Sequence, residues 1–246
     1  MPLEPYKIVG HRLCPYVQRV VIVMLEKGID FEQIDIDLGK KPAWLGDISP
    51  GRQVPVFWAG RDEWLFESGV IARYLDQVTG GGLTPGDPWA RACHEAWMAY
   101  ADGMLNIVAR IIYRDVDASA FASSLRELQE RLWIVNDRFP PHKYFAGDAF
   151  GLVDTVFATL FRYFSVLDSV SEAKLNDLLP QELMEWWALV GSRKSVKDAV
   201  PPTYVAELIQ FIAQKESYAA RVLARREDRT GAVTTRHPGS HNPARH

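Results

Sequence analysis

A strand, a Cys-Pro pair and a helix follow one another within the first 28 residues, and this order constrains the fold more than any other feature. Residues 6–9 form a short apolar run typical of a β-strand. Apolar residues then recur at helical spacing from Val17 to Leu25, and Gly28 supplies a stop. The pattern predicts a strand that turns directly into a helix, with Cys14-Pro15 at the turn.

The predicted turn would make Cys14 a reactive thiol. Cys14 would cap the helix, and Pro15 would take the first helical position, where a missing N–H costs nothing. Unpaired backbone N–H groups and the positive end of the helix dipole favour a thiolate there, and Arg12 and Arg19 would add positive potential. A small apolar cysteine that only caps the helix is the alternative.

The chain divides into two parts of different secondary structure. The first 80 residues alternate strands with helices, which indicates a small α/β domain, and the Gly- and Pro-containing segment 80–87 predicts a linker. After the first strand and helix, we expect a strand at 31–36, a short helix at 42–45, a hairpin of strands at 54–58 and 63–66, and a helix over about 68–78.

Residues 88–224 are predicted to form an all-helical domain. Apolar residues recur at helical spacing over 97–112, 125–135 and 152–164, and the last segment is apolar enough for a buried helix. Gly151 and Asp154 at its start predict an N-terminal cap, with a catalytic carboxylate as the alternative. Residues 225–246 are polar and aperiodic, so we expect a tail with little packed structure.

The composition is that of a soluble globular protein, with 48% hydrophobic and 24% charged residues among 246. A net charge of −3 gives no reason to expect nucleic acid or an anionic membrane, and no apolar run approaches the ~20 residues that span a bilayer. The start lacks a signal-peptide pattern, and two cysteines make no disulfide framework. We expect a cytoplasmic protein without a metal, in which Cys93 is a packing residue.

Two further features of the first domain suit a small zwitterionic peptide. Val54-Pro55 precedes a strand, and a proline there is a candidate for a cis bond in a tight turn that leaves the Val54 backbone free to pair with a peptide. Glu67-Ser68 begins a helix directly after a strand, where N–H groups can hold an anion and Glu67 can pair with an ammonium group. An ordinary helix start is the alternative. Together with Cys14-Pro15, these features predict a site for a thiol peptide.

Five segments of residues 12–76 keep the order and spacing of a known family: Cys14-Pro15-Tyr16, Lys41-Pro42-Ala43-Trp44, Val54-Pro55-Val56, Glu67-Ser68 and Arg73-Tyr74-Leu75-Asp76. On these segments the chain resembles the cytosolic glutathione transferases, and the omega class in particular. The resemblance implies a thioredoxin-like domain over residues 1–80 with a four-stranded mixed sheet and three helices. It also implies an all-helical domain over residues 88–224 and a homodimer.

The same resemblance implies roles for single residues. Cys14 would form a mixed disulfide with glutathione, the co-substrate. Lys41 would reach the glycine carboxylate, Val54 would pair with the cysteinyl backbone, and Glu67 and Ser68 would hold the γ-glutamyl end. The other glutathione-binding residues that it implies are Pro15, Tyr16 and Pro55.

Two aromatic residues fall where omega enzymes place aromatic side chains against the second substrate, namely Tyr204 and Phe211. Because they lie seven residues apart on one predicted helix, packing in the core is the alternative. Gly151 departs from the family, which more often has Ser or Thr at that cap.

Val17 stands where a dithiol oxidoreductase would carry its resolving cysteine, so Cys14 would act alone. Conjugating transferases stabilise the glutathione thiolate with a Tyr or Ser hydroxyl, whereas a cysteine there would form a disulfide. We therefore expect an omega-like thiol transferase or reductase that removes glutathione from ketone thioethers or disulfides, or that reduces dehydroascorbate. The Trp- and Phe-rich helices favour an aromatic or apolar co-substrate.

Two alternatives use the same fold. One is a non-enzymatic regulatory protein, like the stringent-starvation regulators that bind RNA polymerase, but those lack the cysteine. The other is a relative of the chloride channels, which would need a membrane-inserting segment. The charged stretch from Arg19 to Lys27 is poorly suited to that.

Overall fold

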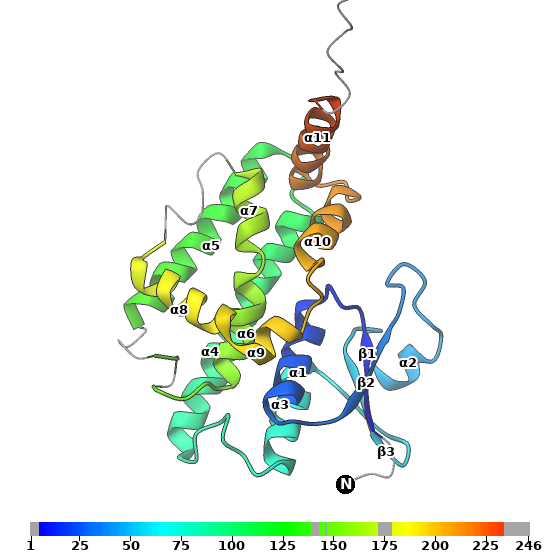
Figure 1. Ribbon diagram of the computed structural model, residues 1–246, viewed down its shortest axis with the longest axis vertical. Helices are drawn as coiled ribbons and strands as arrows, with labels where there is room; N and C mark the ends of the chain where they lie inside the picture. The colour runs from blue at the N-terminus through cyan, green and yellow to red at the C-terminus, as the bar shows by residue number, and fades with distance from the viewer. Residues whose placement is uncertain (1–4, 139–142, 146, 172–178, 234–246) are drawn as a thin grey trace, which may run out of the picture.

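The computed structural model describes residues 5–138, 143–145, 147–171 and 179–233, and it places an α/β domain beside a helical one (Figure 1). The α/β domain has the strand order β2-β1-β3-β4, with β1 and β2 parallel and the other two pairs antiparallel. This mixed sheet with three helices confirms the predicted thioredoxin-like domain. Its elements are β1 (Tyr6–Gly10), α1 (Pro15–Glu26), β2 (Phe31–Asp35), α2 (Leu45–Ile48), β3 (Val56–Gly60), β4 (Glu63–Phe66) and α3 (Ser68–Val78).

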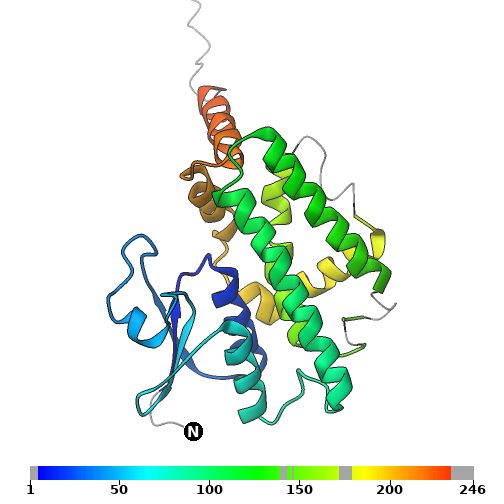
Figure 2. The ribbon, with the colours of Figure 1, turned by 180° about the vertical axis from the view of Figure 1, so that it is seen from behind.

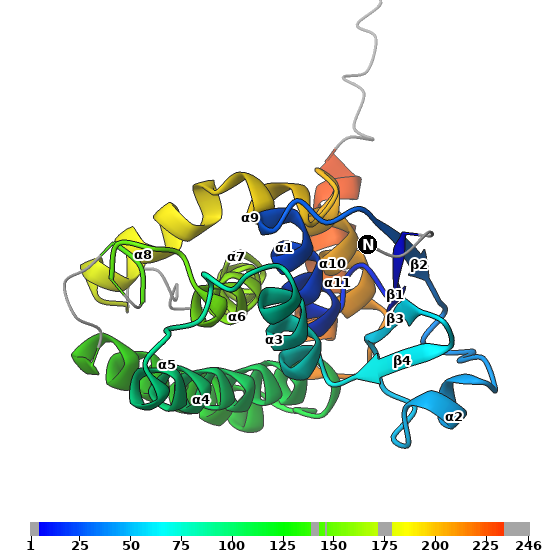
Figure 3. The same ribbon diagram turned by 90° about the horizontal axis from the view of Figure 1, so that it is seen from below.

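Helix α1 is enclosed because it lies between the sheet and the helical domain, as the view in Figure 3 shows. Its residues from Val17 to Met24 are all buried, including Gln18 and Arg19. Helix α3 lies beside α1 on the same face of the sheet, and α2 lies on the other side. Because α1 is buried between the two domains, its N-terminus is held in place, and Cys14 lies there as the N-cap.

Local predictions in the first domain succeed with one correction. The hairpin is confirmed, and the Val54-Pro55 bond is cis. The short helix predicted at 42–45 begins only at Leu45. The carbonyls of Pro42 and Ala43 accept hydrogen bonds from the N–H groups three residues later, on Leu45 and Gly46, as in a tight turn. The Leu45 carbonyl accepts from Ser49, four residues later, as in an α-helix.

The second domain confirms the all-helical prediction. Its long helices α4 and α5 run side by side, as Figure 2 shows from behind. Asp87 caps α4, since its carboxylate accepts the backbone N–H of Ala90 at 2.8 Å, and Pro88 follows as the first helical residue. The elements are α4 (Pro88–Tyr113), α5 (Ala118–Arg138), α6 (Leu152–Phe161), α7 (Phe164–Val170), α8 (Gln181–Ser192), α9 (Lys194–Asp198), α10 (Tyr204–Ala213) and α11 (Tyr218–Val233).

Asp154 has the capping role that the sequence predicts. Its buried carboxylate accepts hydrogen bonds from the backbone N–H groups of Gly151 at 2.8 Å and Phe145 at 3.0 Å. The indole N–H of Trp186 donates a third, at 2.9 Å. Because the carboxylate is buried, its pKa rises to about 6, although these three hydrogen bonds favour the charged form.

Two predicted boundaries in this domain are wrong. The helix expected over 152–164 stops at Phe161, and α7 begins at Phe164, so Arg162 and Tyr163 form a break. At the break Arg162 donates to the side chain of Gln18 and to the carbonyl of Val196. The tail expected from residue 225 starts later, because α11 continues to Val233, and residues 234–246 lie outside the described part. Within the described part, no helix is long and apolar enough to cross a membrane.

Candidate functional site

Cys14 lies at the N-cap of α1, as predicted, and its side chain is half-buried. The backbone is extended there (φ −73°, ψ 121°), and Pro15 begins the helix. The Cys14 N–H donates to the carbonyl of His11 at 2.8 Å, and the Cys14 carbonyl accepts from Gln18 at 3.1 Å. These bonds fix the thiol at the junction of the turn and the helix.

The pKa of the Cys14 thiol differs in direction from the sequence-based expectation. Burial raises this pKa, and that effect exceeds the opposing ones. The opposing effects come from the backbone N–H groups of Val17 and Tyr16 and from the positive charges of Arg19 and Lys41. The helix N-terminus does favour the thiolate, but removing the sulfur from water disfavours it more.

A hollow of about 600 Å³, here called the large hollow, gathers the predicted glutathione-binding residues of the first domain except Pro15. Tyr16, Lys41, Val54, Pro55, Glu67 and Ser68 all line it. The Lys41 ammonium donates to the carbonyl of Arg52 at 2.9 Å, which holds Lys41 along the wall. The remaining lining residues are Leu38, Ser49, Gln53, Asp102, Asn106 and Tyr113.

Glu67 holds an unusual backbone position at the start of α3. Its φ is +67°, in the left-handed region, and its carbonyl accepts hydrogen bonds from Val70 and Ile71, each at 2.9 Å. Ser68, the first residue of α3, is buried. The turn therefore presents a carboxylate and a hydroxyl to the same hollow.

The second domain contributes polar residues that the sequence reading missed. Asp102 and Asn106 of α4 line the large hollow, and the Asp102 carboxylate forms an ion pair with the buried guanidinium of Arg19. The hydroxyl of Tyr16 lies 3.5 Å from the Asn106 side-chain oxygen. Asp102 and Asn106 lie four residues apart on an otherwise apolar helical face, and that spacing could have identified them.

A second hollow, the small hollow, adjoins the first and has a volume of about 140 Å³. Cys14 and Pro15 line it, and three residues line both hollows: Tyr16, Leu38 and Tyr113. Most of its wall is apolar, and the other residues are His11, Leu13, Leu105, Val108, Ala109, Ile112, Tyr163, Leu208 and Phe211. A polar space and an apolar space thus meet at Tyr16, and the Cys14 thiol faces the apolar one.

Of the two aromatic residues predicted for the second substrate, only Phe211 lines the small hollow together with Cys14. The Phe211 ring lines the small hollow, 5.9 Å from the ring of His11 and 6.3 Å from that of Tyr113. Tyr204 is buried elsewhere, under the guanidinium of Arg162, and lines a separate surface hollow. The burial of Tyr204 fits the alternative, in which this residue packs in the core.

His11 and Tyr163 are further residues of the small hollow that were not predicted. The His11 Nδ1 accepts the N–H of Leu13 at 3.2 Å. Among the described residues, no three His, Cys, Asp or Glu side chains cluster so that they could hold a metal ion. The side chains that line the small hollow include a thiol, phenols and an imidazole.

Comparisons with known proteins agree with this arrangement. Residues 13–78 match the family model for the glutathione S-transferase N-terminal domain, and residues 94–193 match the model for its C-terminal domain. Glutathione S-transferase omega-1 of Sus scrofa is 28% identical over 185 residues, which cover 74% of this chain and 75% of that protein. Glutathione transferase GST 23 of Zea mays is 30% identical over 199 residues, which cover 79% of this chain and 89% of that protein. The solved structure of rice GST1 (OsGSTU1) in complex with glutathione superposes with a TM-score of 0.76 at 26% identity, covering 86% of this chain and 96% of the other.

Proposed function

This chain belongs to the glutathione S-transferase family, and from that premise we propose that it is an omega-like, glutathione-dependent thiol transferase acting through a mixed disulfide of Cys14. One observation carries the proposal: Cys14 lines the small hollow, and Tyr16, two residues further on, lines both the small hollow and the large hollow. A peptide in one hollow and an apolar group in the other would both reach the Cys14 sulfur. The free thiols of Cys14 and Cys93 suit a reducing compartment, so we place the protein in the cytoplasm.

The large hollow suits glutathione in size and in charge. A volume of about 600 Å³ lies within the roughly 300–1,000 Å³ common for small-molecule sites. Glu67 would pair with the ammonium of the γ-glutamyl end, and Ser68 would donate to its carboxylate. Lys41 would bind the glycine carboxylate, and the Val54 backbone would pair with the cysteinyl residue.

The proposed reaction has two exchange steps. The Cys14 thiolate attacks the glutathionyl sulfur of a mixed disulfide, the new Cys14–glutathione bond forms, and the released thiolate takes a proton from solvent. The thiolate of a second glutathione then attacks the glutathionyl sulfur bound to Cys14. Oxidised glutathione leaves and the Cys14 thiolate is restored. Each step exchanges one S–S bond for another.

The raised pKa of Cys14 sets the pH dependence of the first step. At neutral pH only a small fraction of this thiol would be ionised, but a thiolate of high pKa is the stronger nucleophile. The rate of attack would therefore rise with pH until Cys14 is ionised. The positive charge of Lys41 would assist ionisation of the Cys14 thiol, because it lowers this pKa.

Conjugation of glutathione to an electrophile is the second candidate, favoured by the match to the maize transferase. Cys14 supports thiol transfer instead, because a cysteine beside bound glutathione can form a disulfide where a hydroxyl cannot. The large hollow would be used in both reactions. The two candidates differ in the role of residue 14: in thiol transfer it forms a disulfide with glutathione, and in conjugation it stabilises the glutathione thiolate.

Replacing Cys14 by serine separates the two candidates. The test measures glutathione-dependent reduction of a glutathione mixed disulfide by the wild type, by Cys14→Ser and by the matched control Cys93→Ser. We expect the wild type and Cys93→Ser to be active and Cys14→Ser to be inactive, with a weak conjugating activity toward an aryl halide gained instead. Full disulfide reduction by Cys14→Ser would contradict the proposal.

A further inference from the structure

The ammonium group of Lys215 lies over two aromatic rings of the small hollow. Its Nζ is 3.9 Å from the centre of the Phe211 ring and 5.9 Å from that of the Tyr113 ring. Both rings line the hollow, and their centroids are 6.3 Å apart. Tyr113 is 50% exposed, so this pair of rings marks the side on which the hollow opens to solvent. A positive charge therefore lies beside the opening of a largely apolar space.

Local structure holds Lys215 in this place. It lies in the turn between α10 and α11, and its backbone N–H donates to the carbonyl of Ile212 at 2.9 Å. Phe211 comes four residues earlier, near the end of α10, so its ring lies under the Lys215 side chain. A cation and the face of an aromatic ring attract each other, and this contact restricts a side chain that is otherwise long and flexible.

The charge of Lys215 forms no ion pair with any of the described residues. Glu207, on α10, is already bound by Arg12 at 2.8 Å. Glu216 follows Lys215 in sequence but forms no ion pair with it. An anionic group at the opening of the small hollow would therefore meet a cation that these carboxylates leave uncompensated.

The other basic groups near Cys14 are less suited to bind an anion in the small hollow. Arg19 is paired with Asp102, and Lys41 lines the large hollow, where it would bind the glycine carboxylate of glutathione. Burial lowers the pKa of His11, so its imidazole is mostly uncharged at neutral pH. Lys215 therefore supplies the charge that an anion in this hollow would meet.

We propose that Lys215 binds the carboxylate of an aryl thiol that is joined to glutathione in a mixed disulfide, so that the preferred co-substrate is aromatic and anionic. This inference rests on the proposed function and names the substrate class of that site. An apolar cavity of about 150 Å³ can bind benzene, so a hollow of about 140 Å³ is the right size for one aromatic ring. A carboxylate on that ring, directed toward Phe211 and Tyr113, would reach the Lys215 ammonium.

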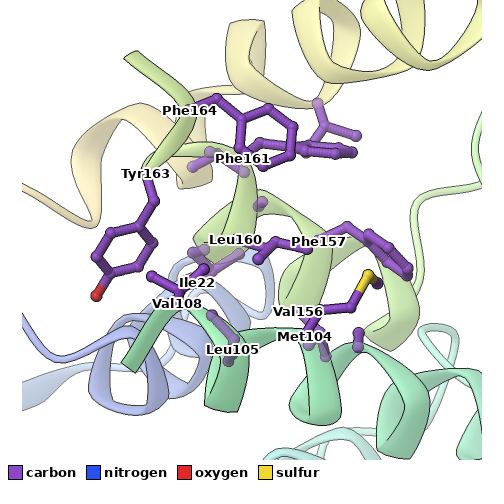
Figure 4. Close-up of a cluster of buried hydrophobic side chains, with 14 of the residues drawn as sticks. Ile22, Met104, Leu105, Val108, Val156, Phe157, Leu160, Phe161, Tyr163 and Phe164 are labelled. Atoms are coloured by element: carbon purple, nitrogen blue, oxygen red, sulfur yellow. The ribbon is translucent and has the colours of Figure 1, made fainter. Parts of the chain in front are cut away.

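The rest of the hollow is held in place by the core. Leu105, Val108 and Ile112 of α4 line it and are buried. Figure 4 shows Leu105 and Val108 in the same buried cluster as Ile22 of α1. Because a close-packed core resists rearrangement, these residues would not move aside for a larger group. The hollow thus limits the substrate to about one ring, and Lys215 favours a negative charge on it.

Lys215 takes no part in the bonds that form and break. The Cys14 thiolate attacks the glutathionyl sulfur, the Cys14–glutathione bond forms, and the bond to the aryl sulfur breaks. The electron pair leaves on the aryl thiolate, which takes a proton from solvent, and a second glutathione then restores Cys14 and leaves as oxidised glutathione. Lys215 is a positioning residue, so its charge should lower KM for an anionic disulfide and change kcat little.

The test compares two mixed disulfides of glutathione on full-length variants. One is formed with 4-mercaptobenzoic acid, and the other with 4-mercaptobenzamide, whose carboxamide is uncharged and has nearly the same shape. The variants are Lys215→Met, which keeps an unbranched side chain, and Lys215→Arg, which keeps the charge. The matched control is Lys143→Met, which removes another lysine near a ring, 5.9 Å from the centre of Tyr144 and outside both hollows.

The measured quantity is the ratio of kcat/KM for the acid to kcat/KM for the amide, because intrinsic differences between the two disulfides then cancel between variants. We expect Lys215→Met to lower this ratio at least about threefold through a higher KM for the acid, and Lys215→Arg and Lys143→Met to stay inside that limit. The wild-type ratio should also fall as salt is added, because salt screens a partly exposed charge, whereas the ratio for Lys215→Met should not.

A smaller fall in Lys215→Met, a fall beyond the same limit in either other variant, or a wild-type ratio that does not respond to salt would overturn the role of Lys215. If the wild type is active on both disulfides, each of these results overturns only this inference. A wild type inactive on both disulfides would overturn the proposed function together with it.

Discussion

The carboxylate of Glu26 and the guanidinium of Arg193 form a two-pronged ion pair across the two domains, with Nε–Oε1 and Nη2–Oε2 distances of 2.6 Å each. Glu26 is the last residue of α1, and Arg193 connects α8 to α9. The Ser195 hydroxyl also donates to Glu26, and the Arg193 guanidinium lies 4.4 Å from the centre of the Phe150 ring. This contact anchors the helix that carries Cys14 at its other end.

Arg193→Lys should destabilise the fold although it keeps the charge. Lysine cannot make the two parallel hydrogen bonds or stack on Phe150, so we expect the free energy of unfolding in urea to fall by about 1–3 kcal/mol. The matched control is Asp198→Asn, which breaks the exposed ion pair of Lys194 on the neighbouring helix and should cost less than about 0.5 kcal/mol. Equal effects of the two substitutions would show that the interdomain pair contributes no more than a surface pair.

Asp154→Ala should be among the most destabilising single substitutions. It leaves three buried donors, on Gly151, Phe145 and Trp186, without their acceptor. We expect a loss of about 3–5 kcal/mol in the free energy of unfolding, measured by urea titration followed by tryptophan fluorescence. A loss below about 1 kcal/mol would mean that these donors find other partners.

Asp154 should also give the stability a definite pH dependence. Its folded pKa of about 6 exceeds the ordinary aspartate pKa of about 3.9, so the folded state binds the proton more tightly. Stability therefore falls as pH rises through the window from about 4 to about 6, by an amount on the order of 2–3 kcal/mol. This part of the pH profile should be missing in Asp154→Asn, and its persistence there would assign it to another group.

Glu67→Gln should weaken glutathione binding while the turn before α3 stays intact. The substitution keeps the size of the side chain but removes the charge proposed to pair with the γ-glutamyl ammonium. We expect Kd in calorimetry to rise about tenfold or more, because a charge-assisted bond is worth roughly 1.5–3 kcal/mol. Glu63→Gln, in the preceding strand and outside both hollows, is the control. An unchanged Kd in Glu67→Gln would remove Glu67 from the site.

A twofold-symmetric homodimer is expected from the family, and the first domain carries a surface that suits one. Trp44 and Trp64 are exposed and lie 5.9 Å apart between ring centroids, with Phe66 exposed on the same strand as Trp64. We expect a dimer mass in sedimentation experiments at micromolar concentration and a shift toward monomer in Trp64→Glu. A wild-type monomer under these conditions would contradict the dimer.

Local patterns predicted the parts of the site that depend on neighbouring residues. The Cys14-Pro15 cap, the turn before Pro55 and the Asp154 cap each need only a few residues in sequence, so the sequence alone indicated them. The order of strands and helices along the chain indicated an α/β domain, and the family resemblance implied its four-stranded mixed sheet.

The parts that were missed depend on contacts between distant segments. Neither proline nor glycine marks the break at Arg162 and Tyr163, where Arg162 binds Gln18 and Val196 instead of continuing the helix. Asp102 of α4 lies far from the first domain in sequence, and its place in the site depends on the ion pair with Arg19 of α1. The predicted direction of the Cys14 pKa shift was wrong for the same reason. The dipole of α1 depends only on neighbouring residues and can be inferred from the sequence, whereas the burial of the thiol depends on contacts with distant segments.

Mass spectrometry after incubation with oxidised glutathione tests the central role of Cys14 most directly. The account predicts one added glutathionyl group per chain, located on Cys14 and not on Cys93, and released again by reduced glutathione. The rate of addition should rise with pH, because the pKa of Cys14 is raised. Modification of Cys93 alone, or none on Cys14 at any pH at which the fold persists, would contradict the account.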